Sequence, residues 1–220
     1  MIRLANVYKR YPGGIEALAD VSCEIRRGEL VVLTGPSGAG KSSLLHLIAA
    51  IEPPSAGRIF LNGEDLTRFG RRAMPYVRRQ FGLVFQDHKL LHDRSVFDNV
   101  ALPLRITAFD PAAIPNRVNA ALDKVGLLAR ARSMPVALSG GEQQRLCIAR
   151  AIVHRPSILL ADEPTGNLDS AYALAIAEVL QSLHRAGSTV VIATHDPTLA
   201  SASRPRRMEL RAGQLSEVPG

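Results

Sequence analysis

The sequence predicts an α/β fold with a mostly parallel sheet, because apolar runs of strand length alternate with segments of helical periodicity. Three runs, at residues 30–34, 158–161 and 189–194, are almost continuously apolar, as in strands that are covered on both faces. Segments with helical spacing of apolar residues lie between them. This alternation favours a parallel sheet with helices on both of its faces.

The N-terminal residues predict an antiparallel β subdomain beside this core. Ile2 and Leu4, and later Val21, Cys23 and Ile25, alternate with polar residues, which is typical of half-buried strands. Further strands are expected at residues 58–61 and 82–85.

Helices are predicted where apolar residues recur at intervals of three and four. The segment after Lys41 has this pattern, which stops at the pair Pro53-Pro54. Asp110 and Pro111 have the order of an N-cap and a first-turn proline, so another helix is expected to begin there. Two more helices are expected at residues 141–153 and 171–183.

The organisation along the chain indicates a single domain of residues 1–220. The stretch from residue 89 to 135 has no buried-strand pattern and is largely helical in its spacing, so we interpret it as an insertion. We expect the α/β core, with its β subdomain, in about residues 1–88 and 146–220, and the helical insertion in about residues 89–145.

The composition fits a globular protein of the cytoplasm. With 220 residues and 46% hydrophobic content, the chain can bury a core without disulfides. Cys23 and Cys147 lie in apolar surroundings without metal-ligand spacing, so they are interpreted as buried residues in a reducing compartment. The start lacks the pattern of a signal peptide, and no apolar run approaches the roughly 18 residues of a membrane span. We therefore expect membrane association through a partner only.

The charge is basic, with 27 Lys and Arg against 20 Asp and Glu, a net +7. Such a surface attracts nucleic acids, anionic lipids and nucleotides alike. Aromatic residues make up 5% and there is no Trp, so stacking on single strands is not indicated and no nucleic-acid partner is expected. One dense arginine cluster is either a solvated face or a binding patch: Arg68, Arg71, Arg72, Arg78 and Arg79.

A glycine-rich segment between the strand at 30–34 and the following helix matches the phosphate-loop pattern GxxxxGK[ST]. Its residues are Gly35, Pro36, Ser37, Gly38, Ala39, Gly40, Lys41 and Ser42. Glycines let successive backbone N–H groups face an anion, and the helix N-terminus adds positive potential. Lys41 would reach the outer phosphates, and the Ser42 hydroxyl would bind Mg²⁺. The segment predicts a nucleoside triphosphate site in a P-loop NTPase.

A pair of acidic residues ends the apolar strand at 158–161. Asp162 and Glu163 come at its end, and Pro164 stops the strand. An enzyme that hydrolyses a nucleotide needs carboxylates to hold the metal and to orient water. We predict that Asp162 helps to hold the metal and that Glu163 polarises the attacking water. The alternative, a solvated acidic turn, is weaker directly after four apolar residues.

A second anion-binding helix start is expected after Leu138. The residues Ser139, Gly140, Gly141 and Glu142 present a hydroxyl and backbone N–H groups at the positive end of a helix. One chain would then carry one nucleotide loop and two phosphate-binding ends. This suggests that the second end serves the nucleotide of another subunit.

With the segment LSGGE at 138–142, the chain resembles the ATP-binding-cassette (ABC) ATPases along essentially its whole length. The resemblance implies a RecA-like core, ATP and Mg²⁺ as ligands, ATP hydrolysis, and a homodimer that closes around ATP. Ser43 stands where the family usually has Thr. The loop at residues 167–169 would cross the dimer interface.

Three further roles are implied by this resemblance. Tyr11 would stack on adenine, Gln86 would sense Mg²⁺ and water, and His195 would contact the γ-phosphate. Taken singly, each has a plain alternative: a packed edge aromatic, a polar strand end and a histidine at a helix start. Their positions relative to Lys41 and Glu163 favour the functional roles.

Residues 85–100 and 161–169 resemble the FtsE family of bacterial cell-division ATPases. The resemblance implies a polytopic membrane partner of FtsX type, a position at the cytoplasmic face of the inner membrane at the septum, and activation of cell-wall hydrolases. The alternative is the ATPase of a lipoprotein-release or macrolide-export transporter. ABC proteins that act on nucleic acid are a further alternative, but they usually carry coiled-coil insertions or duplicated cassettes.

A docking surface for the membrane partner is expected after Gln86. Leu90 and Leu91 form an apolar pair in a loop, so they are predicted to be exposed and to contact a cytoplasmic helix of the partner. Val96 and Phe97, one helical turn before Val100, are expected in the core instead.

Overall fold

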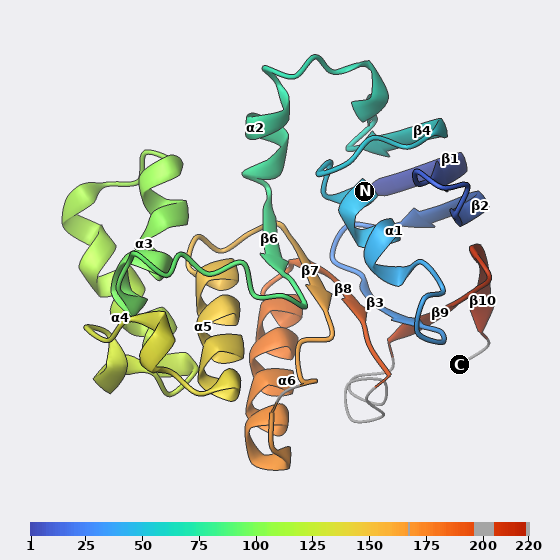
Figure 1. Cartoon of the computed structure of the whole chain (residues 1–220). Coiled ribbons are helices and arrows are strands. Elements are labelled where there is room, and N and C mark those ends of the chain that lie inside the picture. Colours follow the sequence, from blue (N-terminus) through green and yellow to red (C-terminus); the bar gives the residue numbers. More distant parts are fainter. Residues whose placement is uncertain (167, 196–204, 219–220) are drawn as a thin grey trace.

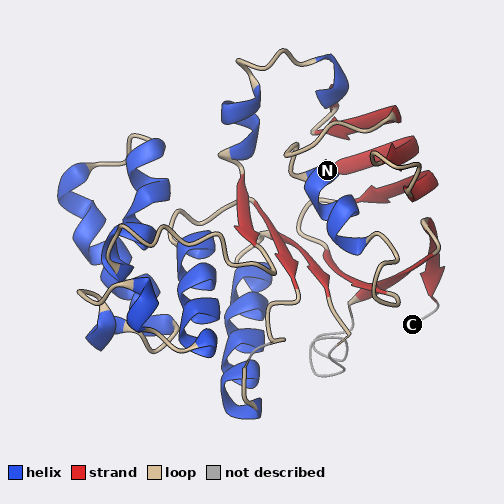
Figure 2. Cartoon of the chain, in the orientation of Figure 1, coloured by secondary structure: helices blue, strands red, loops and turns tan. Residues whose placement is uncertain are grey.

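The computed structural model describes residues 1–166, 168–195 and 205–218. In these ranges it contains a six-stranded sheet, a four-stranded sheet and helices that flank both (Figures 1 and 2). The two sheets and the first helix lie on one side of the molecule in Figure 1, and the helices α3 and α4 lie on the other. No helix in the described ranges has both the length and the apolar composition needed to cross a membrane.

The six-stranded sheet has the strand order β10-β9-β3-β8-β7-β6. Its strands from β6 to β9 pair in parallel, and β10 pairs antiparallel with β9. The three apolar runs form central strands, as predicted. The strands are β3 (Leu30–Thr34), β6 (Phe81–Val84), β7 (Ile158–Asp162), β8 (Thr189–Ala193), β9 (Arg206–Arg211) and β10 (Gln214–Val218).

The register of this sheet brings the ends of β3, β7 and β8 to the same edge. Ala193 of β8 pairs with Leu33 of β3 on one side and with Asp162 of β7 on the other. Because parallel strands end at the same edge of a sheet, the loop after Thr34 and the acidic end of β7 lie close to each other.

The four-stranded sheet is antiparallel and has the order β2-β1-β4-β5, which agrees with the expected N-terminal β subdomain. Its strands are β1 (Ile2–Arg10), β2 (Glu16–Ile25), β4 (Ala56–Leu61) and β5 (Glu64–Asp65). One apolar core joins both sheets through the buried face of α1 (Lys41–Ile48). Residues far apart in sequence, such as Leu4, Leu33 and Leu45, share this core, so it fixes α1 between the two sheets.

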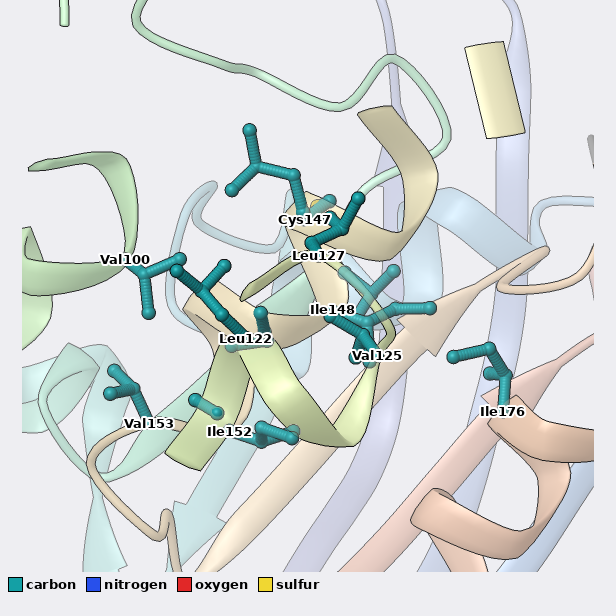
Figure 3. Packing of buried hydrophobic residues seen from close by; sticks show 14 of the residues in the cluster. Val100, Leu122, Val125, Leu127, Cys147, Ile148, Ile152, Val153 and Ile176 are labelled. Carbon is teal, nitrogen blue, oxygen red and sulfur yellow. The ribbon is translucent and has the colours of Figure 1, made fainter. Parts of the chain in front are cut away.

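A second core holds the longer helices against the six-stranded sheet. In Figure 3, Val100, Leu122, Ile148 and Ile176 come from four different helices and belong to the same cluster. The helices are α2 (Met74–Arg78), α3 (Val96–Ile106), α4 (Ile114–Lys124), α5 (Gly140–Ile152) and α6 (Ser170–Arg185), with 3₁₀ turns at Leu66–Arg68, Pro111–Ala113, Leu128–Arg130 and Pro135–Ala137.

Two expectations for local structure need correction. The helix predicted from Asp110 is a 3₁₀ turn at first, because the Asp110 carboxylate accepts from the N–H of Ala112, and the α-helix starts at Ile114. Cys147 is buried, but Cys23 is only half-buried. Burial still raises the pKa of the Cys23 thiol to about 11, so neither cysteine is a ready nucleophile.

The prediction that Leu90 is exposed is wrong. Its side chain is 8% exposed and belongs to the helical core, whereas Leu91 is 38% exposed. The Asn99 side chain explains the difference, because it accepts from the N–H of Leu91 and donates to its carbonyl, both at 2.9 Å. These bonds fasten the loop to α3 and turn Leu90 inward. Val96 is fully buried, as expected.

Candidate active site

The phosphate loop takes a conformation that two glycines make possible. Gly35 (φ +143°) and Gly40 (φ +102°) lie so close to other backbone that a Cβ atom would meet the carbonyl oxygens of Leu210 and Ala17 at 2.1 and 2.3 Å. The helix α1 follows at once, and no side chain caps its N-terminus. Its first N–H groups are therefore available to an anion.

Replacing Gly35 by Ala should destabilise the whole fold, because the new methyl group would collide with the backbone of β9 and not with a movable side chain. We expect a loss of about 3 kcal/mol or more in the free energy of unfolding, measured by urea denaturation. Gly38→Ala is the control, since its Cβ would meet nothing within 4 Å and its φ of +76° costs about 1–2 kcal/mol. Equal losses in the two variants would contradict this assignment.

The side chain of Lys41 folds back over the phosphate loop. Its ammonium group donates to the carbonyl oxygens of Gly35 and Pro36 at 2.7 and 3.1 Å. The positive charge is thus held beside the same backbone that would wrap a phosphate. The hydroxyl of Ser42 hydrogen-bonds to Asp162, which is 7% exposed. Burial raises the pKa of this carboxyl, and the bond to Ser42 opposes the rise.

Glu163 is presented by an unusual backbone turn. Its φ is +47°, in the left-handed region that non-glycine residues seldom occupy, and its N–H donates to the carbonyl of Ala193 at 2.8 Å. The carboxylate accepts from the Thr194 hydroxyl at 3.2 Å and from Nδ1 of His195 at 2.9 Å. This turn directs a carboxylate and an imidazole toward each other at the edge of the sheet.

A cavity of about 660 Å³ unites these groups. Tyr11 lies at its rim, with its hydroxyl 3.2 Å from that of Ser43 and its ring 4.8 Å from the Lys9 ammonium. Ile15, which the sequence did not single out, also lines the cavity and is 65% exposed. The predicted residues that line it are Tyr11, Gly35, Pro36, Ser37, Gly38, Gly40, Lys41, Ser42, Ser43, Gln86, Asp162, Glu163 and His195.

Ala39, also assigned to the nucleotide, does not line this cavity. Its side chain is 5% exposed and packs in the core between the sheets, so only its backbone could face a phosphate.

The second anion-binding end does not lie in this cavity either. The hydroxyl of Ser139 accepts from the N–H of Glu142, whose carboxylate accepts from the N–H of Ser139 at 2.8 Å. This capping box fixes the start of α5, and the backbone bond lowers the pKa of Glu142. In Figure 1, α6 and the strands β7 and β8 lie between the start of α5 and the loop before α1. In agreement with this arrangement, none of the four residues 139–142 lines the cavity described above.

The loop that follows β7 is described in part. Asn167 lies outside the described residues, and Asp169 caps α6 by accepting from the N–H of Tyr172 at 3.0 Å.

A partly buried hydrogen-bond relay connects the segment after Gln86 to this loop, and sequence reasoning missed it. The ring of His88 donates to the side-chain oxygen of Gln144, and the amide of Gln144 donates to the carbonyl of Pro164 at 3.0 Å. Gln144 is 1% exposed, and Pro164 directly follows Glu163. Arg150 of the same helix donates to the carbonyls of His88 and Lys89. α5 thereby holds both segments on one rigid element.

The loop, the acidic strand end and the detached second anion-binding end together define an ATP-binding cassette. The family described as ABC transporter matches residues 18–166. The cell division ATP-binding protein FtsE of Escherichia coli K12 is 53% identical over 98% of this chain and 97% of its own length. The FtsE of Bacillus subtilis is 44% identical over 97% and 93%.

Solved structures give the same result. The dimeric structure of MJ0796, a bacterial ABC transporter cassette, superposes with a TM-score of 0.94 at 35% identity and covers 100% of both chains. A post-hydrolysis state of MJ0796 bound to ADP and Pi is equally similar, at 34% identity. The chain therefore belongs to the ABC transporter ATPases and, within them, to the FtsE cell-division group. It is an ATPase, which converts ATP and water to ADP and phosphate.

Proposed function

We propose that this chain is the ATP-hydrolysing subunit of a membrane ABC complex, in which two copies close head to tail around two ATP molecules. Ser139 and Gly141 are not among the residues that line the cavity of their own chain, which supports this arrangement, as does the dimeric state of the similar cassette MJ0796. Each ATP would lie between Lys41 and Ser42 of one copy and Ser139 and Gly141 of the other.

The cavity residues fit ATP with a magnesium ion. Ser42, Gln86 and Asp162 offer hydroxyl, amide and carboxylate oxygens, which are the hard donors that Mg²⁺ prefers. Two of them, Ser42 and Asp162, are already hydrogen-bonded to each other. The ion, when bound, neutralises phosphate charge. Lys41 would hold the outer phosphates and Tyr11 would stack on adenine, beside the apolar side chain of Ile15.

Glu163 would take the proton of the attacking water. Its carboxylate has two donors, Thr194 and His195, which restrain its orientation. His195 is the more exposed member of its pair with Glu163, so it would also reach the γ-phosphate from the open side of the cavity.

The membrane partner would dock in a groove between the core and the helical region. The groove has a volume of about 460 Å³, and its apolar residues include Phe85, Leu102 and Ile106. Since Leu90 is buried, this groove replaces the pair of leucines as the docking surface. Lys89 and Arg150 also line it, so a helix docked there would contact the segment that the His88–Gln144 relay connects to Pro164, the residue after Glu163.

The cell-division role is carried by the 53% identity to the FtsE of E. coli over 98% of this chain. On this basis we infer an FtsX-type membrane protein as the partner, activation of cell-wall hydrolases as the outcome, and a position on the cytoplasmic face of the inner membrane at the septum. The second candidate is the ATPase of a lipoprotein-release or macrolide-export transporter. Identification of the membrane protein that co-purifies with the native chain distinguishes the two.

Ile106→Asp should abolish co-purification of the membrane partner, because it places a charge in the apolar groove. Ile106 is 53% exposed, so folding and the ATPase activity of the isolated chain should stay within a few-fold of wild type. Leu174→Asp is the matched control, since Leu174 is 55% exposed and lies on α6, outside the groove. If the division role holds, cells that carry Ile106→Asp will grow as filaments or chains. Retention of the partner would place docking elsewhere.

A further inference from the structure

A basic surface covers α2 and the turn before it. We call it the arginine patch and define it by Arg71, Arg72, Arg78, Arg79 and Tyr76, all exposed. Tyr76 is 67% exposed, and the Arg79 guanidinium lies 4.8 Å from the centre of its ring. Residues 66–80 contain no Asp or Glu, so the patch has no acidic residue of its own segment to neutralise it.

The charges of the patch also lack partners from elsewhere in the described ranges. None of its four arginines has a carboxylate within 4.0 Å among those residues, whereas the neighbouring Arg68 approaches Asp65 at 3.5 Å. Arg78 donates to the carbonyl of Ala50 at 2.8 and 3.0 Å, which fixes its position. Like charges that are gathered without counter-charges repel one another, and an anionic partner would relieve that repulsion.

An apolar cavity of about 690 Å³ lies beside these arginines. Phe69, Met74 and Ile51 are among its lining residues, and Arg71 and Arg78 line it too. Glu52 also lines it, but its carboxylate is paired with Lys9 at 2.7 Å. An apolar hollow next to arginines and an exposed tyrosine has the composition that suits the boundary between lipid headgroups and acyl chains.

The position of the patch indicates that it faces the anionic headgroups of the membrane. Pro75, Arg78 and Arg79 line the docking groove described above, so a membrane protein seated there would bring α2 close to the bilayer. In Figure 1, α2 also lies at the end of the molecule opposite the start of α5, away from the edge that would close around ATP. Bacterial inner membranes would therefore present their headgroups to this surface and not to the nucleotide site.

We propose that the arginine patch binds anionic phospholipid headgroups, with Tyr76 at headgroup depth, and so orients the ATPase beneath its membrane partner. The proposal rests on the docking of a membrane protein in the groove, and it adds direct lipid contact to the association through the partner alone that the sequence suggested. In the described ranges no carboxylate pairs with Arg71, Arg72 or Arg79, and Arg79 lies over the Tyr76 ring, so these side chains can contact phosphates at the surface. Arg78 instead fixes the segment to Ala50, which follows α1.

The test is co-sedimentation of the purified full chain with vesicles of phosphatidylcholine alone or mixed with phosphatidylglycerol. Wild type should bind the mixed vesicles only, and high salt should release it. Combined replacement of Arg71, Arg72 and Arg79 by Gln should lower binding by about fivefold per arginine, or on the order of 100-fold in total. Arg72→Gln alone should give about a fivefold loss, which checks the larger variant against general damage to the fold.

The matched control removes an equal number of positive charges, three arginines, from another surface. Arg27, Arg117 and Arg155 line a separate cavity of about 580 Å³, and their joint replacement by Gln should leave vesicle binding near that of wild type. Equal losses in the two triple variants would show that net charge alone acts, and would overturn the proposal. Absence of binding by wild type to the mixed vesicles would overturn it too.

Two further results separate this proposal from the function on which it rests. If the patch variant binds vesicles normally but loses its membrane partner in detergent, the arginines contact protein and the lipid assignment is wrong. If Ile106→Asp keeps its partner while the patch variant loses vesicle binding, the docking groove is wrong and the lipid contact stands.

Discussion

Glu163→Gln should leave ATP bound while turnover falls by about 10²–10⁴-fold, the range for loss of a general base. The substitution keeps the shape of the side chain but removes its charge and its ability to take a proton, while the amide oxygen can still accept from His195. The backbone cost of the left-handed conformation at this position is the same for both residues, so the fold should be unaffected. ATP should then accumulate in closed dimers, because in the proposed arrangement hydrolysis would open them.

Phosphate release and retention of labelled ATP after gel filtration measure the two effects. Glu178→Gln makes the same chemical change on the exposed side of α6 and should have wild-type turnover. If Glu163→Gln retains turnover within a few-fold of wild type, another group must activate the water, and the 2.9 Å contact between Glu163 and His195 would have only a structural role.

The nucleotide loop was predictable because all of its evidence is local. A buried strand, eight residues of fixed pattern and a helix follow one another in the chain, and the carboxylates at the end of β7 join them through the regular alignment of parallel strands. No tertiary detail was needed to place Lys41, Asp162 and Glu163 in one cavity.

Leu90 shows where such reasoning stops. The sequence gives an apolar pair in a loop, and which member is buried depends on the Asn99 side chain, which binds the backbone of Leu91 from the next helix. The relay from His88 through Gln144 was also out of reach, because it joins polar residues 56 positions apart and no spacing rule connects them. Both features depend on hydrogen bonds between different elements. Local residue patterns predict the elements but not the hydrogen bonds between them.

The separation of Ser139 from its own nucleotide cavity leads to a second large effect, on mixtures of two inactive variants. Lys41→Ala should fail to bind phosphate, and Ser139→Arg should block the other subunit's nucleotide. In a mixed dimer, one composite site carries both lesions, and the other combines an intact loop with an intact helix start. Such a dimer has one working site, provided that the two copies are related by a twofold axis.

Mixing equal amounts of the two proteins should therefore restore about one quarter of wild-type ATPase activity, since half of the dimers are mixed and half of their sites work. Loss of the serine cap could weaken α5 by about 1 kcal/mol, so Ser139→Asp serves as a second variant that keeps a capping oxygen and repels phosphate. Each variant alone should be inactive at every protein concentration. If mixed dimers form, as shown by differential tags, and no activity returns, each chain must complete its own site and the head-to-tail arrangement is wrong.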